Sequence, residues 1–316
     1  MSYTLENDGS RRYSLNAKRE IVSPKDGQDF YVDRVSSRLG RLAVVRGRIF
    51  HPVDTPNDPV RVQIENGWSA PAAAYYGGAA KMASRGVAAA IYDTYHPPVG
   101  ADIKDPLRGA EMGGMEMLDI FEDIAGDSEL ALVGHSTGAL TAWRMALRDE
   151  RVSYVVGEAP VGLEHHEMYK AYLQNLPGMS KELYNYIMSL RKDKFGWDVL
   201  REFFTLNATD PSRLVRQVWM LGKGPDLAPL LDEAHQRDIL NGLILLKDDM
   251  FFKYHKQAAV LERKRHLFDA VRTVEGAQHL YPNRHPAGSA EVRLSVLDEL
   301  RRLKRLGKTA VDAPAV

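Results

Sequence analysis

The sequence contains no cysteine among its 316 residues. Disulfides, Cys-based zinc sites and catalysis by a thiolate are therefore excluded. Any covalent or acid–base chemistry has to come from serine, aspartate, glutamate and histidine side chains.

The sequence also lacks a long apolar run and an excess of one charge. The amino-terminal stretch MSYTLENDGSRRYSLNAKRE has no signal-peptide core, and no later run is long enough to cross a bilayer. We therefore expect a cytoplasmic protein with no membrane span. Lys and Arg total 42, as do Asp and Glu, so no overall field would attract nucleic acid. We expect a small molecule, and not nucleic acid, as the partner.

The hydrophobic content of 44% is enough for a substantial core. Short apolar runs typical of buried strands alternate with amphipathic stretches typical of helices. This alternation predicts an α/β fold whose mostly parallel sheet carries helices on both faces. The predicted strands are 60–64, 87–92, 130–133, 152–157, 242–246 and 270–274, and the predicted helices are 72–84, 108–124, 293–306 and one starting at 139. Two antiparallel strands, 30–32 and 42–50 with a turn at 36–40, are expected before them.

The segment Gly134-His135-Ser136-Thr137-Gly138 joins a buried strand directly to an amphipathic helix. So short a connection predicts a sharp turn with a strained backbone at Ser136 and an outward-pointing hydroxyl. Glycine at positions 134 and 138 would let the strand and the helix pass close together beneath the serine, because glycine has no Cβ.

This strand, GxSxG turn and helix form a nucleophile elbow, and on it the sequence resembles the α/β-hydrolase superfamily. The resemblance covers about residues 28–306. It implies an α/β-hydrolase fold with a mostly parallel central sheet, helices on both faces and a helical cap insertion. We expect the hydrolase core at 28–160 and 237–306, the cap at 161–236, an N-terminal extension at 1–27 and a frayed tail at 307–316.

A serine hydroxyl needs an imidazole to remove its proton, and the imidazole needs a carboxylate to orient it. The segment Gly276-Ala277-Gln278-His279 resembles the family's histidine loop, so the resemblance implies that His279 is the base for Ser136. Asp249 matches the family's acid best. Asp248 stays open as an alternative, and Glu158, at the end of the preceding strand, is a less favoured one.

The segment Asn66-Gly67-Trp68 follows the strand at 60–64 and resembles the family's HG-type loop, with asparagine in place of histidine. The resemblance implies that the backbone N–H groups of Trp68 and Thr137 would hold an oxyanion. A plain turn between a strand and a helix is the alternative interpretation.

Between the strands at 152–157 and 242–246 lie several predicted helical segments rich in aromatic residues, which resemble the family's cap. Two or three of these aromatic side chains are expected to contact an apolar substrate; the candidates are Tyr169, Tyr172, Tyr184, Tyr186, Phe203, Phe204 and Trp219. Residues 164–167, Glu-His-His-Glu, do not predict a metal site, because adjacent helical side chains diverge by about 100°. His96 is expected to be a packed loop residue. We expect neither a metal nor a cofactor.

The resemblance implies a serine hydrolase that cleaves a carboxylic ester, with an apolar or acyl ester as substrate, through a Ser136-His279-Asp249 triad and an acyl-enzyme intermediate. The same machinery serves thioester, lactone, amide and carbon–carbon bond hydrolysis, and these stay open. A noncatalytic ligand-binding relative is a different class, which the apparently intact triad disfavours. The oligomeric state, a homo-oligomer included, is also left open.

Overall fold

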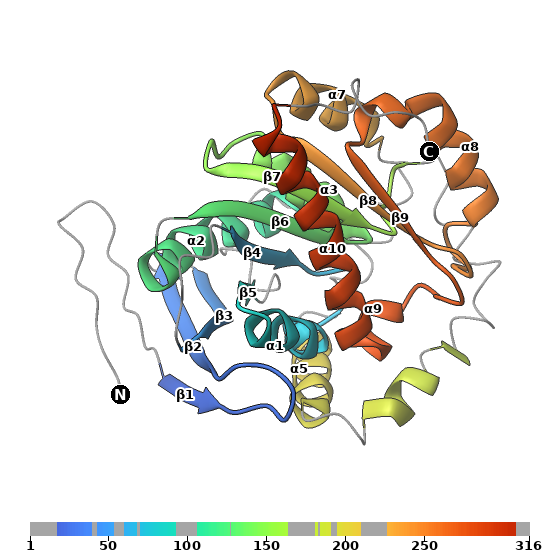
Figure 1. Cartoon of the computed structure of the whole chain (residues 1–316). Coiled ribbons are helices and arrows are strands. Elements are labelled where there is room, and N and C mark those ends of the chain that lie inside the picture. The colour runs from blue at the N-terminus through green and yellow to red at the C-terminus, as the bar shows by residue number, and fades with distance from the viewer. Residues whose placement is uncertain are drawn as a thin grey trace.

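The structure is a computed structural model of the chain (Figure 1). It describes residues 18–39, 43–53, 60–67, 70–92, 106–126, 128–163, 181–182, 184–190, 195–209 and 226–307.

The described residues form a nine-stranded sheet with the order β1-β2-β3-β5-β4-β6-β7-β8-β9. The strands β4 to β9 run parallel to one another, and β1, β2 and β3 form an antiparallel extension on β5. The predicted mostly parallel sheet is therefore confirmed. The strands are β1 Lys18–Val22, β2 Phe30–Leu39, β3 Ala43–Pro52, β4 Val60–Glu65, β5 Ala88–Tyr92, β6 Glu129–His135, β7 Val152–Glu158, β8 Leu240–Leu246 and β9 Ala270–Val274.

Helices cover both faces of the sheet, as predicted. In Figure 1, α1 and α10 lie together in front of the sheet, and α2 and α3 lie together behind it. The helices are α1 Tyr76–Ser84, preceded by the short 3-10 helix η1 Ala72–Tyr75, then α2 Pro106–Ala125, α3 Thr137–Ala146, α5 Gly196–Thr209, α7 Ala228–Gln236, α8 Tyr254–Lys264 with η2 Arg265–Leu267, α9 Tyr281–Arg284 and α10 Pro286–Arg305.

The central strands are apolar because both of their faces are covered. Every residue of β8 is buried, and so is every residue of β6 after its first. A strand with two buried faces reads as a continuous apolar run and not as an alternating one. The apolar runs in the sequence therefore locate these strands well. Because the strands are buried, the residues that follow them are held in place at the edge of the sheet.

The antiparallel extension differs from the sequence prediction. Residues 18–22, inside the expected N-terminal extension, form β1 and pair with β2. Residues 36–39, expected in a turn, continue β2 and pair with β3. An edge strand needs no continuous apolar run, and Ile21 is 62% exposed. The paired charges of Arg19 and Asp33, 2.8 Å apart, help to hold β1, and hydropathy does not reveal such a contact.

We refer to residues 161–236, between β7 and β8, as the insertion. Its helix α5 lies beside η1 and α1 (Figure 1). The Asp198 carboxylate pairs with Arg48 of β3 at 2.7 Å, and Glu202 accepts the N–H of Ala73 at 2.9 Å. The described part of the insertion is thus fixed to the core by buried and half-buried polar contacts.

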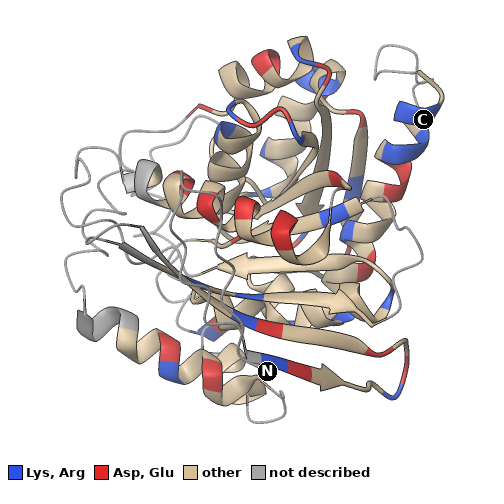
Figure 2. Ribbon diagram, turned by 90° about the vertical axis from the view of Figure 1, so that its left-hand side faces the viewer, with Lys and Arg blue, Asp and Glu red and all other residues tan. Residues whose placement is uncertain are grey.

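None of the helices in the described ranges has both the length and the apolar character that crossing a bilayer requires. Figure 2 shows residues of both charge signs interspersed over the helices and outer strands, consistent with the equal totals in the sequence.

Candidate active site

Ser136 occupies a strained turn at the carboxyl end of β6, directly before α3. Its backbone has φ 55° and ψ −119°, a conformation that non-glycine residues seldom adopt. The Ser136 N–H donates to the carbonyl of Glu158 at 2.9 Å, and its carbonyl accepts the N–H of Val161 at 3.2 Å. The neighbouring strand β7 and the chain after it therefore hold the turn in place.

The two glycines of the motif make close backbone approaches. A Cβ on Gly134 would overlap the backbone of Ala139 in α3. A Cβ on Gly138 would overlap the carbonyl of Glu65 and lie 2.5 Å from that of Asn66, at the end of β4. The predicted contact between strand and helix therefore involves Gly134, whereas Gly138 brings the helix against the neighbouring strand.

Three predicted site residues lie in one chain of hydrogen bonds. His279 Nε2 is 3.2 Å from Ser136 Oγ, and His279 Nδ1 is 2.7 Å from Asp249 Oδ2. The other carboxylate oxygen of Asp249 accepts the N–H groups of Phe251 at 2.7 Å and Phe252 at 3.1 Å. These bonds fix the carboxylate, which in turn orients the imidazole. The three side chains come from the end of β6 and the loops after β8 and β9.

The two alternative acids have other surroundings. The side chain of Asp248 is exposed. The carboxylate of Glu158 is buried and accepts hydrogen bonds from Arg293 at 2.5 and 2.8 Å and from Ser289 at 3.2 Å. Asp249 is thus the acidic residue whose carboxylate reaches His279.

The environment of His279 favours its charged form. Burial by itself lowers the pKa of the imidazole, but the charge of Asp249 and its hydrogen bond raise the pKa above the usual value, and the charges of Glu182 and Glu158 add to the rise. A buried imidazole that is stabilised as a cation is suited to take a proton from a hydroxyl and return it later.

A sequence model of the family described as the alpha/beta hydrolase family matches residues 66–292, which is most of the chain. The chain belongs to the alpha/beta hydrolase family. The fold expected from the elbow is confirmed by this match. No curated protein matches the chain by sequence.

Solved structures similar to this hydrolase share its fold at low sequence identity. A thioesterase domain from the curacin biosynthetic pathway has a TM-score of 0.58 and 15% identity, over 83% of this chain and 99% of that one. An enol-lactonase from Burkholderia xenovorans has a TM-score of 0.56 and 13% identity, over 81% and 97%. A thermophilic esterase from Thermogutta terrifontis has a TM-score of 0.53 and 13% identity, over 84% and 98%. At these identities the likeness shows the fold alone.

Sequence reasoning missed a buried polar chain beside His279 in this hydrolase. The Gly67 N–H donates to the Tyr75 hydroxyl at 2.9 Å, Tyr75 is 2.8 Å from His135 Nδ1, and His135 Nε2 is 3.0 Å from the carbonyl of His279. Burial and the neighbouring His279 and Arg293 charges lower the pKa of His135 well below its usual value. His135 is therefore neutral, with Nε2–H donating to the carbonyl and Nδ1 accepting from Tyr75. Its place inside the GxSxG motif was the one available signal.

The predicted oxyanion donors are only partly within the described ranges. Thr137 is the first residue of α3, a position whose N–H has no acceptor within the helix. Trp68 lies outside the described residues, as do His96 and the stretch 164–167.

The aromatic residues proposed for the pocket have mixed positions. Tyr169, Tyr172 and Trp219 lie outside the described residues. Tyr184 and Phe204 are 62% and 68% exposed, whereas Phe203 is half-buried and Tyr186 is buried. Tyr186 belongs to the hydrophobic core, and the ring of Phe203 packs against that of Phe204.

Proposed function

We propose that this hydrolase cleaves carboxylic esters through an acyl-enzyme intermediate. Ser136 is the nucleophile, His279 the general base and Asp249 the acid that orients it. The observation that carries the proposal is the unbroken path from Ser136 Oγ to His279 Nε2 at 3.2 Å and from His279 Nδ1 to Asp249 at 2.7 Å.

With Nδ1–H donating to Asp249, Nε2 of His279 is the atom that takes the Ser136 proton. The serine oxygen then attacks the ester carbonyl, and the N–H groups of Thr137 and Trp68 stabilise the oxyanion. His279 returns the proton to the leaving alcohol. A water molecule, deprotonated by the same nitrogen, then attacks the acyl group, and the bond to Ser136 breaks as its oxygen regains the proton.

The insertion, residues 161–236, acts in this proposal as a cap over the core, which begins at β1 and resumes at residue 237. Its residue Glu182 accepts the N–H of Leu280, directly after His279, at 2.6 Å. The residues Ser136 and His279 are 1% and 6% exposed, and in this proposal a movement of the insertion admits the substrate. The aromatic content of the insertion favours an apolar acyl group as the substrate's bound part.

A fluorophosphonate probe tests the nucleophile directly. We expect the wild-type protein to be labelled and Ser136→Ala to be unlabelled while folded. Ser295→Ala removes an exposed hydroxyl from α10 and is expected to be labelled like the wild type. A folded wild-type protein that resists the probe, or equal labelling of Ser136→Ala, would overturn the proposal.

A panel of nitrophenyl esters with acyl chains of increasing length tests the substrate class, with a thioester, a lactone and an amide of matched acyl size measured beside it. We expect kcat/KM to rise with acyl length and to be highest for the oxygen esters. A flat response to acyl length would contradict the apolar pocket. Binding of these compounds without turnover would favour a noncatalytic ligand-binding protein.

A further inference from the structure

The peptide bond between His279 and Leu280 is held from two sides. Its carbonyl accepts Nε2–H of His135 at 3.0 Å, and its N–H donates to Glu182 Oε1 at 2.6 Å. The described chain has no cis peptide, so the carbonyl and the N–H point in opposite directions. We call the hydrogen bond from His135, the residue before Ser136, the core clamp. We call the hydrogen bond to Glu182, which belongs to the insertion, the insertion clamp.

The core clamp is supported by two further hydrogen bonds. His135 is fixed in one tautomer by Tyr75, and Tyr75 by the N–H of Gly67 at 2.9 Å. A Cβ on Gly67 would lie 2.9 Å from His135 Nδ1 and 3.1 Å from the Tyr75 hydroxyl, so the loop at Gly67 packs tightly against this chain. The loop proposed to carry an oxyanion donor and the loop that carries His279 are thus linked through two side chains.

The insertion clamp lowers the stability of the folded state, because it requires a buried carboxyl group. The Glu182 residue is 2% exposed, and its oxygen Oε2 has no hydrogen-bond partner among the residues that the structure describes. Burial raises the pKa of Glu182, against the opposing effect of the Leu280 N–H. Burying a carboxylate oxygen without a hydrogen-bond partner lowers the free energy of unfolding, so stability alone does not explain Glu182. Within the described ranges, its carboxylate accepts a hydrogen bond from the N–H of Leu280, in the peptide that follows His279.

We propose that Glu182 and His135 are positioning residues that act on His279 through this single peptide bond, so that the histidine is correctly placed only when the insertion is docked. The proposal rests on the proposed function in treating His279 as the general base. It makes the insertion part of the catalytic geometry, beyond its role as a cover for the substrate.

Two Glu182 variants separate the hydrogen bond from the charge. Glu182→Gln keeps an oxygen for the Leu280 N–H, and we expect kcat within about threefold of wild type. Glu182→Ala removes the acceptor, and we expect kcat to fall about 10- to 100-fold with little change in KM. The fall of kcat/KM at low pH, its acid limb, reports protonation of His279. Because the Glu182 charge raises the pKa of His279, both variants should move this limb of the pH profile to lower pH. The other charged or titratable groups near the imidazole, Asp249, Glu158 and His135, are unchanged in both.

Glu202→Ala is the matched control. Glu202 is also an insertion carboxylate that accepts a backbone N–H, that of Ala73 at 2.9 Å, and it accepts a second hydrogen bond from the Tyr76 hydroxyl at 3.2 Å. We expect it to lower the melting temperature and to leave the acid limb unchanged. An acid limb that moves equally in Glu202→Ala and Glu182→Ala would overturn the proposal, and so would a wild-type kcat in Glu182→Ala.

The core clamp is tested with Tyr75→Phe, which keeps the ring and frees the tautomer of His135. We expect a loss in kcat of about 3- to 10-fold. The double variant Tyr75→Phe/Glu182→Ala should lose less than the product of the single losses, because both act on one peptide. If the loss in kcat of the double variant equals the product of the two single losses, Tyr75 and Glu182 do not act through the same peptide bond.

A readout independent of turnover keeps this proposal distinct from the proposed function. The downfield NMR resonance of the His279 Nδ1–H reports its hydrogen bond to Asp249. We expect that resonance to persist in Glu182→Gln and to weaken in Glu182→Ala. An unchanged resonance in Glu182→Ala would refute the positioning role even if the natural substrate is not an ester. Failure of wild-type labelling by the fluorophosphonate would instead refute the esterase function.

Discussion

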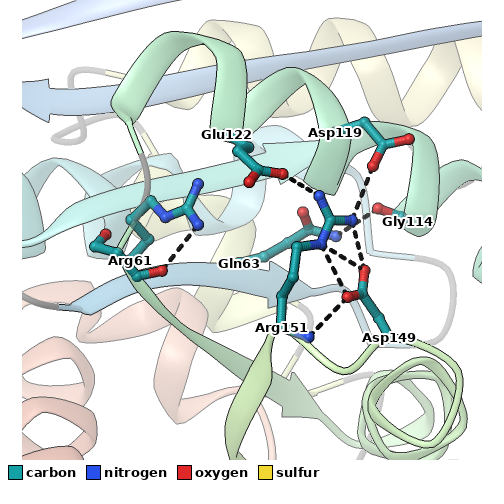
Figure 3. A network of polar contacts seen from close by, with 8 residues as sticks. Arg61, Gln63, Gly114, Asp119, Glu122, Asp149 and Arg151 are labelled. Carbon is teal, nitrogen blue, oxygen red and sulfur yellow. Dashed lines mark hydrogen bonds and ion pairs between the residues drawn. The ribbon is translucent and has the colours of Figure 1, made fainter.

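The two edges of the sheet are built in different ways. At the amino ends of the strands, Arg151 makes ion pairs with Asp149 at 2.6 Å, Asp119 at 2.8 Å and Glu122 (Figure 3). Nearby, at the start of β4, Arg61 donates to the carbonyl of Ser128 at 2.9 Å. The charge of Arg151 is thus matched by carboxylates of opposite sign, and this favours stability.

The carboxyl edge holds strain and unmatched polar groups. Ser136 and Ala159 have positive φ, Glu65 is a fully buried carboxyl group, and one oxygen of Glu182 has no partner in the described part of the chain. Such features cost stability and cluster where a protein binds or reacts. The amino edge is not free of such features, since Asp238 before β8 also has positive φ and Asn241 Nδ2 has no hydrogen-bond partner among the described residues. The contrast therefore lies in the ion pairs of Arg151, which stabilise the framework that carries the strained turn at Ser136.

The largest expected effect is at the elbow. Both Ser136→Ala and Ser136→Gly should lower ester turnover on the order of 10⁴-fold or more, because the nucleophile is gone. Glycine tolerates φ 55° and alanine does not, so Ser136→Gly should be more stable than Ser136→Ala by about 1 kcal/mol in urea unfolding. If the glycine variant were the less stable one, the backbone at Ser136 would not be strained.

Local sequence pattern predicts the elbow well, because its causes are local. A buried strand, two glycines and a helix lie within one continuous stretch, and their geometry follows from sterics. Asp249 and His279 required the family resemblance, since spacing along the chain does not say that residues 30 apart meet. Their catalytic roles remain predictions.

The remaining contacts around the site could not be predicted from the sequence. The bond between Tyr75 and His135 joins residues 60 apart, and that between Glu182 and Leu280 joins residues 98 apart. Hydropathy periodicity reports which face of an element is buried, and it carries no information about which polar atoms then meet. Edge strand β1 was missed for a related reason, because the ion pair of Arg19 with Asp33 that helps to hold it cannot be read from hydropathy.

The second prediction concerns the close approach that keeps the elbow next to β4. Gly138→Ala should destabilise the fold by about 3 kcal/mol, because the new Cβ would overlap the Glu65 carbonyl and backbone cannot easily yield. Gly78→Ala in α1 is the control, since its nearest atom would be 3.6 Å away. It should be neutral or stabilising by up to about 1 kcal/mol. Chemical denaturation of both variants checks this, and equal stabilities would contradict the tight packing.

The third prediction uses the buried carboxyl group of Glu65. Burial raises the pKa of Glu65 to about 7, against hydrogen bonds from Tyr92 and Gln63. The Tyr92 hydroxyl lies 2.5 Å from Glu65 Oε2 and 2.8 Å from the carbonyl of Ala110, and it has one proton for two acceptors. A protonated Glu65 resolves this by donating to Tyr92, which then donates to Ala110.

A group whose folded-state pKa is raised holds its proton more tightly in the folded state. Its stabilising contribution is fully present below the unfolded pKa of 4.5 and is lost as the pH rises through about 7. The wild type should therefore lose roughly 2 to 3 kcal/mol across this window relative to Glu65→Gln, which mimics the protonated form. Urea unfolding at intervals from pH 4.5 to 8 measures the difference, and parallel pH profiles would show that Glu65 is charged when folded.

The smallest effect is expected at the amino edge. Arg151→Met should lower the free energy of unfolding by about 1 to 2 kcal/mol, because the buried Asp149 and the half-buried Asp119 and Glu122 carboxylates lose their common partner and repel one another. The loss should shrink as salt is added, since salt screens that repulsion. Arg85→Met, which breaks the exposed pair with Glu291, should cost under about 1 kcal/mol. If the two edges of the sheet are as separate as their contacts indicate, Arg151→Met leaves kcat unchanged. A fall in kcat in a variant that is still folded would show that the strained turn at the carboxyl edge depends directly on the ion pairs at the amino edge.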